Sequence, residues 1–132
     1  MINVLLADDH QFMRKAICEL LKNDAEVHLV GETRSFRETI DLTAEVCPDV
    51  VVMDIHMGDA QNVKPSDLKS GLVDCQLLAM SLWTDEETKV LAKSFGAVAL
   101  LDKTKLATEL LPLLRQYGQG RRAHHGSLPG KN

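Results

Sequence analysis

The sequence is poor in aromatic residues, and it has no excess of basic charge and no long apolar run. Aromatic residues make up only 4% of its 132 residues, so a core must consist mainly of aliphatic side chains and methionine. The formal net charge of −4 argues against a nucleic-acid-binding surface, which is normally basic. No apolar run approaches the length of a membrane span, and the N-terminal segment lacks the basic start and long apolar stretch of a signal peptide.

The cysteines are few and unpaired in sequence. Cys18, Cys47 and Cys75 are far apart and include no C-x-x-C pair, which disfavours both a disulfide framework and a zinc site. We therefore expect a soluble, cytoplasmic protein with no membrane partner. The length corresponds to one domain, and 45% hydrophobic with 26% charged residues is typical of a globular chain.

Short apolar runs alternate with segments of helical periodicity. Continuous apolar runs are typical of strands covered on both faces, and here they cover residues 2–7, 27–31, 50–53, 76–82 and 97–101. Residues 35–38 and 84–87 have the pattern of capping boxes, which predicts helices that start near residues 36 and 85. The alternation predicts an α/β fold of the (βα)₅ type, a doubly wound parallel sheet with helices on both faces.

Two segments depart from this pattern. Residues 58–75 are polar, which predicts a long loop followed by a short third helix near residue 66. The last helix is expected to end near Tyr117, and Pro112 should kink it or shift its start. From Gly118 onward, glycine, proline and polar residues predict a disordered tail, either a linker to a further segment or an added remnant. We therefore assign residues 1–117 to the domain and 118–132 to the tail.

Polar residues stand at the carboxyl ends of the predicted strands, namely Asp8, Asp9, Asp54, Ser81 and Lys103. Open parallel sheets bind their ligands at this edge. Three clustered carboxylates repel one another without a cation, and Mg²⁺ is the hard divalent ion that favours oxygen ligands and a shared phosphate. A carboxylate can attack phosphorus, while a lysine and a hydroxyl contact the transferred oxygens. The set therefore predicts phosphoryl transfer to Asp54.

Each of these residues also has a plain structural interpretation. Asp54 could begin a solvated loop, and Asp8 and Asp9 could place favourable negative charge at a helix N-terminus. Lys103 could be a surface lysine, and Ser81 a small residue at a strand end. The joint placement of all five at one sheet edge favours the phosphoryl-transfer interpretation.

The same residues stand in blocks that resemble the signature blocks of response-regulator receiver domains. The blocks are VLLADDH (residues 4–10), PDVVVMDIHM (48–57), Ser81 and GAVALLDK (96–103). The ADDH start and the Val-Gly-Glu segment at 30–32 are most similar to NarL/LuxR-type receivers. The resemblance covers residues 1–117 and implies a flavodoxin-like three-layer sandwich with a five-stranded parallel sheet of order 2-1-3-4-5.

The resemblance also implies a role for each site residue. Asp54 would accept the phosphoryl group from a sensor histidine kinase or from a small donor such as acetyl phosphate. Mg²⁺ would be held by Asp8, Asp9, Asp54 and the backbone carbonyl of His56, while Lys103 would contact the phosphoryl group and Ser81 would carry the conformational change. Such a domain is no enzyme beyond self-catalysed transfer and slow autodephosphorylation. Its expected partners include a second copy on phosphorylation, and transcription would be its output if a DNA-binding domain follows.

Three departures from the family pattern motivate an alternative, a phosphorylation-independent module for protein interaction. Gly58 stands where the family usually has proline, and residues 61–62 stand where the family has an Asp-Gly turn. Leu100 occupies the position of the family's aromatic switch residue, and Trp83 could fill part of the role of that residue. A phosphatase with an aspartate nucleophile is a further alternative, but it would carry a second Asp where this chain has His56. The His56 side chain could instead help or block a water that attacks the phosphorylated acceptor.

Overall fold

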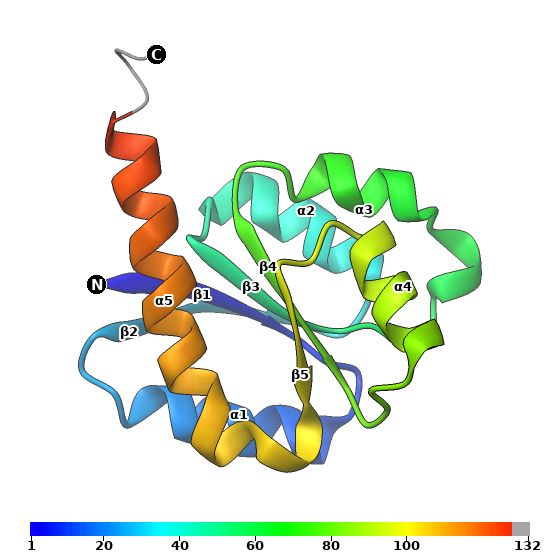
Figure 1. Cartoon of the computed structure of the whole chain (residues 1–132), viewed down its shortest axis with the longest axis horizontal. Helices are drawn as coiled ribbons and strands as arrows, with labels where there is room; N and C mark the ends of the chain where they lie inside the picture. The colour runs from blue at the N-terminus through cyan, green and yellow to red at the C-terminus, as the bar shows by residue number, and fades with distance from the viewer. Residues whose placement is uncertain (128–132) are drawn as a thin grey trace.

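A five-stranded parallel sheet with helices on both faces forms the body of the computed structural model, which describes residues 1–127 with side chains to residue 118 (Figure 1). The strands are β1 (Ile2–Ala7), β2 (Val27–Thr33), β3 (Val50–Asp54), β4 (Gln76–Ser81) and β5 (Ala99–Asp102), in the order β2-β1-β3-β4-β5. The helices are α1 (Gln11–Lys22), α2 (Phe36–Val46), α3 (Pro65–Gly71), α4 (Glu86–Ser94) and α5 (Leu106–Ser127), with 3₁₀ turns η1 (Ala60–Asn62) and η2 (Lys103–Lys105). The predicted flavodoxin-like (βα)₅ fold and strand order are confirmed.

Two apolar layers hold the sheet between its helices. Along β1, Val4 and Leu6 pack toward α1 and α5, whereas Leu5 and Ala7 pack toward α2, α3 and α4. All four side chains are fully buried, which explains why the strand is a continuous apolar run rather than an alternating one. The two layers fix the strands in register and so fix the edge where their carboxyl ends meet.

The helix starts follow from capping residues. At α2 the Ser35 hydroxyl accepts a hydrogen bond from the Glu38 backbone N–H at 3.0 Å, as the capping-box pattern predicted. At α4 the cap is Asp85, whose carboxylate accepts from the Thr88 N–H at 2.9 Å, so the prediction of a box opening at residue 84 was one residue early. Aspartate is a strong N-cap because its carboxylate also suits the positive end of the helix dipole.

The segment before β5 corrects a second boundary. The sequence predicted a strand over 97–101, but β5 runs from Ala99 to Asp102 because the preceding residues finish α4. Gly96 adopts a left-handed conformation with φ of 86°, and its N–H donates to the Lys93 carbonyl at 2.9 Å. The Ala97 N–H then donates to the Ala92 carbonyl at 3.1 Å, so both residues close the helix end.

The last helix is longer than predicted. The expected end near Tyr117 was wrong, because α5 continues to Ser127 with Pro112 in its interior and projects beyond the body of the domain (Figure 1). No proline stands between residues 113 and 127, and the arginines and alanine at 121–123 favour helix, which offsets the glycines. Residues 128–132 of the predicted tail lie outside the described residues.

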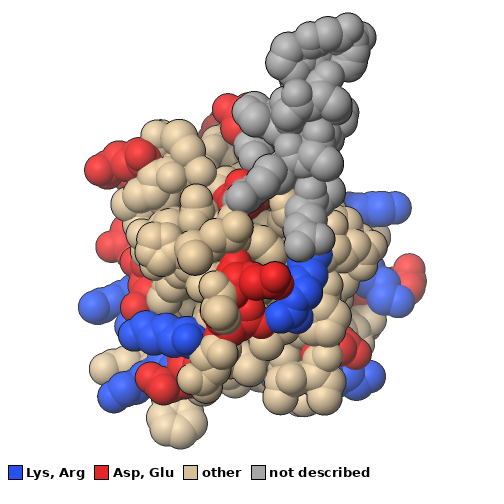
Figure 2. All heavy atoms as spheres, turned by 90° about the vertical axis from the view of Figure 1, so that its left-hand side faces the viewer, with Lys and Arg blue, Asp and Glu red and all other residues tan. Residues whose placement is uncertain are grey.

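The surface carries interspersed charges. On the face drawn in Figure 2, acidic and basic side chains lie next to each other, and its described atoms form no continuous basic patch. Among the described residues, Arg115 on α5 forms ion pairs with Asp24 and Glu26 in the α1–β2 connection. Within residues 1–127, no helix combines the length and apolar character required to span a membrane.

Candidate functional site

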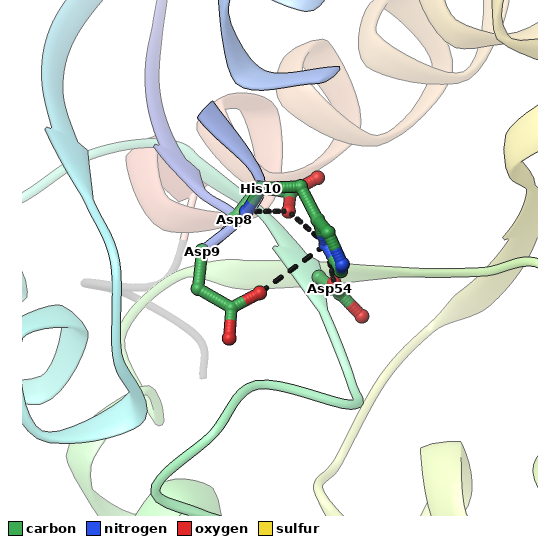
Figure 3. A group of neighbouring side chains, drawn as sticks. All are labelled: Asp8, Asp9, His10 and Asp54. Carbon is green, nitrogen blue, oxygen red and sulfur yellow. Dashed lines mark hydrogen bonds and ion pairs between the residues drawn. The ribbon is translucent and has the colours of Figure 1, made fainter. Parts of the chain in front are cut away.

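The carboxyl ends of β1 and β3 bring three aspartates together (Figure 3). The two strands are neighbours with Ala7 opposite Met53, so Asp8, one residue past β1, lies beside Asp54 at the end of β3. Asp8 is fully buried and Asp54 is 2% exposed. Asp9 is more open, with a side chain 30% exposed. One carboxylate oxygen of each aspartate lies within 4.8 Å of the others, so the cluster faces solvent from a buried base.

Lys103 reaches this cluster from the turn after β5. Its Nζ donates to one oxygen of Asp8 at 2.9 Å and to one oxygen of Asp54 at 3.0 Å, and its side chain is 4% exposed. The predicted placement of the lysine near the acceptor is therefore met. The ammonium thus contacts two of the three carboxylates, and the cluster is open on its Asp9 side.

The turn that carries Lys103 is stabilised by hydrogen bonds that do not involve the three carboxylates of the site. Asp102 caps η2 by accepting hydrogen bonds from the Thr104 N–H at 2.9 Å and the Thr104 hydroxyl at 2.7 Å. The hydrogen bonds from Thr104 hold the pKa of the Asp102 carboxyl below its ordinary value. Asp102 therefore positions the turn, while its neighbour in sequence reaches the carboxylates.

His10 is a site residue that the sequence did not predict. Its Nδ1 lies 3.3 Å from an oxygen of Asp8, 3.3 Å from an oxygen of Asp9 and 3.6 Å from an oxygen of Asp54. Figure 3 shows the ring directed into the space between the carboxylates. The only signal in the sequence was its position directly after Asp9, and the ring direction depends on the conformation of the turn, in which the His10 N–H donates to Asp8 at 2.9 Å.

Backbone donors on the loop after β3 fix two of the carboxylates. The His56 N–H donates to Asp54 Oδ1 at 2.8 Å, and the Gly58 N–H donates to Asp9 Oδ2 at 2.9 Å. Asp59 ties the same loop to the start of α2, because its two oxygens accept from the backbone of residues 36 and 37 at 2.9 and 3.1 Å. A proline at position 58 has no N–H and could not hold Asp9 in this way.

Ser81, predicted to act beside the acceptor, ends β4 next to Asp54, whose register partner is Met80. The hydroxyl is fully buried and lies 3.1 Å from His56 Nε2, and it accepts from the Trp83 N–H at 3.0 Å. His56 thus directs its backbone N–H at Asp54 and its ring at Ser81. The role of the His56 backbone carbonyl as a metal ligand stays a prediction.

The donor set suits a hard divalent cation. The three carboxylates supply oxygen ligands, and two of them are buried with a single lysine to balance them. Magnesium takes such ligands, keeps several waters and is typically shared with a phosphate. The open Asp9 side leaves room for those waters, so the residues present fit this ion.

Comparison with known proteins identifies the family of this domain. Residues 4–115 match the family described as the response regulator receiver domain. The chain is 31% identical to the DNA-binding transcriptional activator DevR/DosR of Mycobacterium tuberculosis, over 92% of this chain and 56% of that protein. It is 26% identical to the transcriptional regulatory protein LiaR of Bacillus subtilis, over 99% of this chain and 63% of that protein. The chain therefore spans less than two-thirds of either relative.

Solved structures agree on the fold. The response regulator domain of Thermotoga maritima CheB superposes with a TM-score of 0.76 and 26% sequence identity, over 90% of this chain and 97% of that one. The non-phosphorylated receiver domain of RcsB from Escherichia coli has a TM-score of 0.77 at 18% identity, over 90% of this chain and 94% of that one.

Proposed function

The chain belongs to the response regulator receiver domain family, and we propose that it is a phosphorylation switch whose acceptor is Asp54. The observation that carries the proposal is the buried Asp54 carboxylate, which has Lys103 Nζ at 3.0 Å and the carboxylates of Asp8 and Asp9 beside it. Phosphoryl transfer depends mainly on positioning and charge neutralisation, and these groups supply both.

In the proposed step, a carboxylate oxygen of Asp54 attacks the phosphorus of the donor. A phosphorus–oxygen bond forms to Asp54, and the bond from phosphorus to the donor nitrogen of a phosphohistidine, or to the acyl oxygen of acetyl phosphate, breaks. The electron pair of that bond leaves with the imidazole or the acetate. Lys103 places a positive charge beside the transferred oxygens, and its second hydrogen bond, to Asp8, keeps the ammonium in place.

Asp8, Asp9 and Asp54 would hold Mg²⁺ in this proposal, and His56 would add its backbone carbonyl. When bound, the ion offsets the negative charge of the carboxylates and of the phosphoryl oxygens. The chain prepares its ligands beforehand, because the Gly58 N–H orients Asp9 and the His56 N–H orients Asp54. Removal of the ion with a chelator is expected to stop phosphoryl uptake.

The proposal extends to partners and output. A sensor histidine kinase is the expected donor in the cytoplasm, and the phosphorylated domain is expected to bind a second copy of itself. Residues 1–117 are proposed as the domain, with 118–132 as a tail or linker whose first part, to Ser127, continues α5. Control of transcription by the whole protein rests on the names of the relatives DevR/DosR and LiaR, since the chain spans only part of each. The domain itself would only phosphorylate and slowly dephosphorylate its own Asp54.

Intact mass after incubation with Mg²⁺ and acetyl phosphate tests the proposal. The parent protein is expected to gain one phosphoryl group, and the Asp54→Ala variant none. No gain in the parent would contradict the switch and favour the alternative of a phosphorylation-independent interaction module. An equal gain in the variant would place the acceptor elsewhere.

A further inference from the structure

The Ser81 hydroxyl is already engaged on the side away from the acceptor. It is fully buried, it accepts the Trp83 N–H at 3.0 Å, and it lies 3.1 Å from His56 Nε2. A serine hydroxyl has one proton and two acceptor lone pairs, so the two bonds use most of its capacity. A phosphoryl oxygen on Asp54 can only accept, so it competes with the ring of His56 for the single hydroxyl proton when Ser81 donates that proton to Nε2.

His56 contacts three parts of this region at once. Its backbone N–H donates to Asp54 at 2.8 Å, its ring nitrogen meets Ser81, and its ring packs edge-on against the indole of Trp83. The ring centroids are 5.3 Å apart at an angle of 86°, which is the favourable edge-to-face arrangement. One residue thus links the acceptor, the buried hydroxyl and the indole, which is 58% exposed.

We propose that His56 is a positioning residue that holds the Ser81 hydroxyl away from Asp54, and that Ser81 leaves the ring of His56 when it bonds the phosphoryl group. The inference rests on the proposed function, because it requires a phosphoryl oxygen at Asp54. The released ring no longer has its polar partner at Ser81, so its contact with Trp83 changes. Phosphorylation of Asp54 thereby changes the surroundings of the exposed Trp83 indole.

The neighbouring positions support this route. Leu100 on β5 is half-buried and packs in the apolar layer beneath α4, so it has no polar atom that could follow Ser81. A surface hollow of about 380 Å³ lies on the α4 side of His56, lined by His56, Glu87, Thr88, Val90, Leu91 and Ser94. In the proposed switch, this hollow is the space that receives the released ring.

A double-mutant cycle between positions 56 and 81 tests the inference. His56→Phe keeps an aromatic ring beside Trp83 and removes the bond to Ser81, while the backbone groups of residue 56 remain. The probe is beryllium fluoride with saturating Mg²⁺, which forms a phosphoryl analogue on an aspartate, and calorimetry measures its affinity. Loss of one neutral hydrogen bond from the free state should tighten binding by about fivefold in His56→Phe.

The gain is expected to disappear in the Ser81→Ala background, because no hydroxyl is left to release. Equal affinity of the parent and His56→Phe would overturn the inference, and so would the same gain with and without the Ser81 hydroxyl. Fluorescence of Trp83, the single tryptophan, supplies a second readout. Its change on addition of the probe should be smaller in His56→Ala than in the parent, and an unaltered change would contradict the link.

Failure of the inference and failure of the proposed function are distinguishable. If the parent binds beryllium fluoride and the Asp54→Ala variant does not, the acceptor works, and the cycle alone decides the role of His56. If the parent and the Asp54→Ala variant behave alike, the proposed function fails and this inference fails with it.

Discussion

Replacement of Lys103 by methionine should destabilise the fold strongly and make its stability depend on a divalent cation. The lysine side chain is 4% exposed and lies between two carboxylates that are 0% and 3% exposed, at 2.9 and 3.0 Å. Methionine fills a similar volume and has no charge. The substitution therefore leaves Asp8 and Asp54 buried side by side without their ammonium partner.

The magnitude follows from the burial of the pair. Removal of one partner from a buried ion pair costs about 3–5 kcal/mol, a large fraction of a typical stability of about 5–15 kcal/mol. A cation that binds only the folded state at about one hundred times its Kd returns about 2.7 kcal/mol. Adding Asp54→Asn to Lys103→Met should recover part of the loss, because only one buried carboxylate then lacks a partner.

Urea unfolding in a chelator and then in Mg²⁺ measures both effects. The matched control is Lys105→Met, which removes an exposed lysine from the same turn and is expected to change stability by less than about 0.5 kcal/mol. A Lys103→Met variant as stable as this control would refute the buried-pair reasoning. If Mg²⁺ stabilises neither the Lys103→Met variant nor the Lys105→Met control, the cation site is refuted.

Three further predictions concern single positions. Gly58→Pro removes the N–H that orients Asp9, and it should weaken Mg²⁺ binding by about tenfold, which is the worth of a hydrogen bond to a charged group. Gly58→Ala keeps the N–H and should bind Mg²⁺ as the parent does. A titration of each variant with Mg²⁺ decides. The hydrogen bonds from Thr88 lower the pKa of Asp85, so its stabilisation of α4 is full above the ordinary aspartate range and is lost as the pH falls through the lower folded pKa. Asp85→Asn keeps a cap without a titrating group, so its thermal unfolding should depend less on acid, and an identical pH profile would contradict this. Burial raises the pKa of the Cys18 thiol to about 11, so iodoacetamide at mildly alkaline pH should leave Cys18 unmodified in the native protein. Peptide mass spectrometry follows the alkylation of each cysteine. Alkylation of Cys18 as fast as that of the exposed Cys47 would show the reasoning wrong.

The sheet and the acidic cluster were predictable because they depend on patterns that the sequence displays directly. Continuous apolar runs such as residues 50–53 predict strands covered on both faces, and parallel strands necessarily present their carboxyl ends at one edge. Asp8, Asp54 and Lys103 each follow such a run, so their meeting follows from topology alone.

The remaining parts of the site depend on loop conformation, which the sequence does not display. The hydrogen bond from Gly58 to Asp9 and the anchoring of α2 by Asp59 join segments far apart in the chain. The direction of the His10 ring is set by a turn, and a histidine beside two aspartates has many possible directions. The extension of α5 past Tyr117 was missed because glycine lowers helix propensity by only about 1 kcal/mol per residue, which neighbouring helix formers offset.

The central claim is that Asp54 itself carries the phosphoryl group, and chemical mapping tests it most directly. Borohydride reduces an aspartyl phosphate to homoserine, so peptide mass spectrometry after incubation with Mg²⁺ and acetyl phosphate identifies the modified position. Phosphorylation of Asp54 predicts homoserine at position 54 and aspartate at positions 8 and 9. Homoserine at another aspartate, or at no position in a protein that has gained a phosphoryl group, would contradict the assignment.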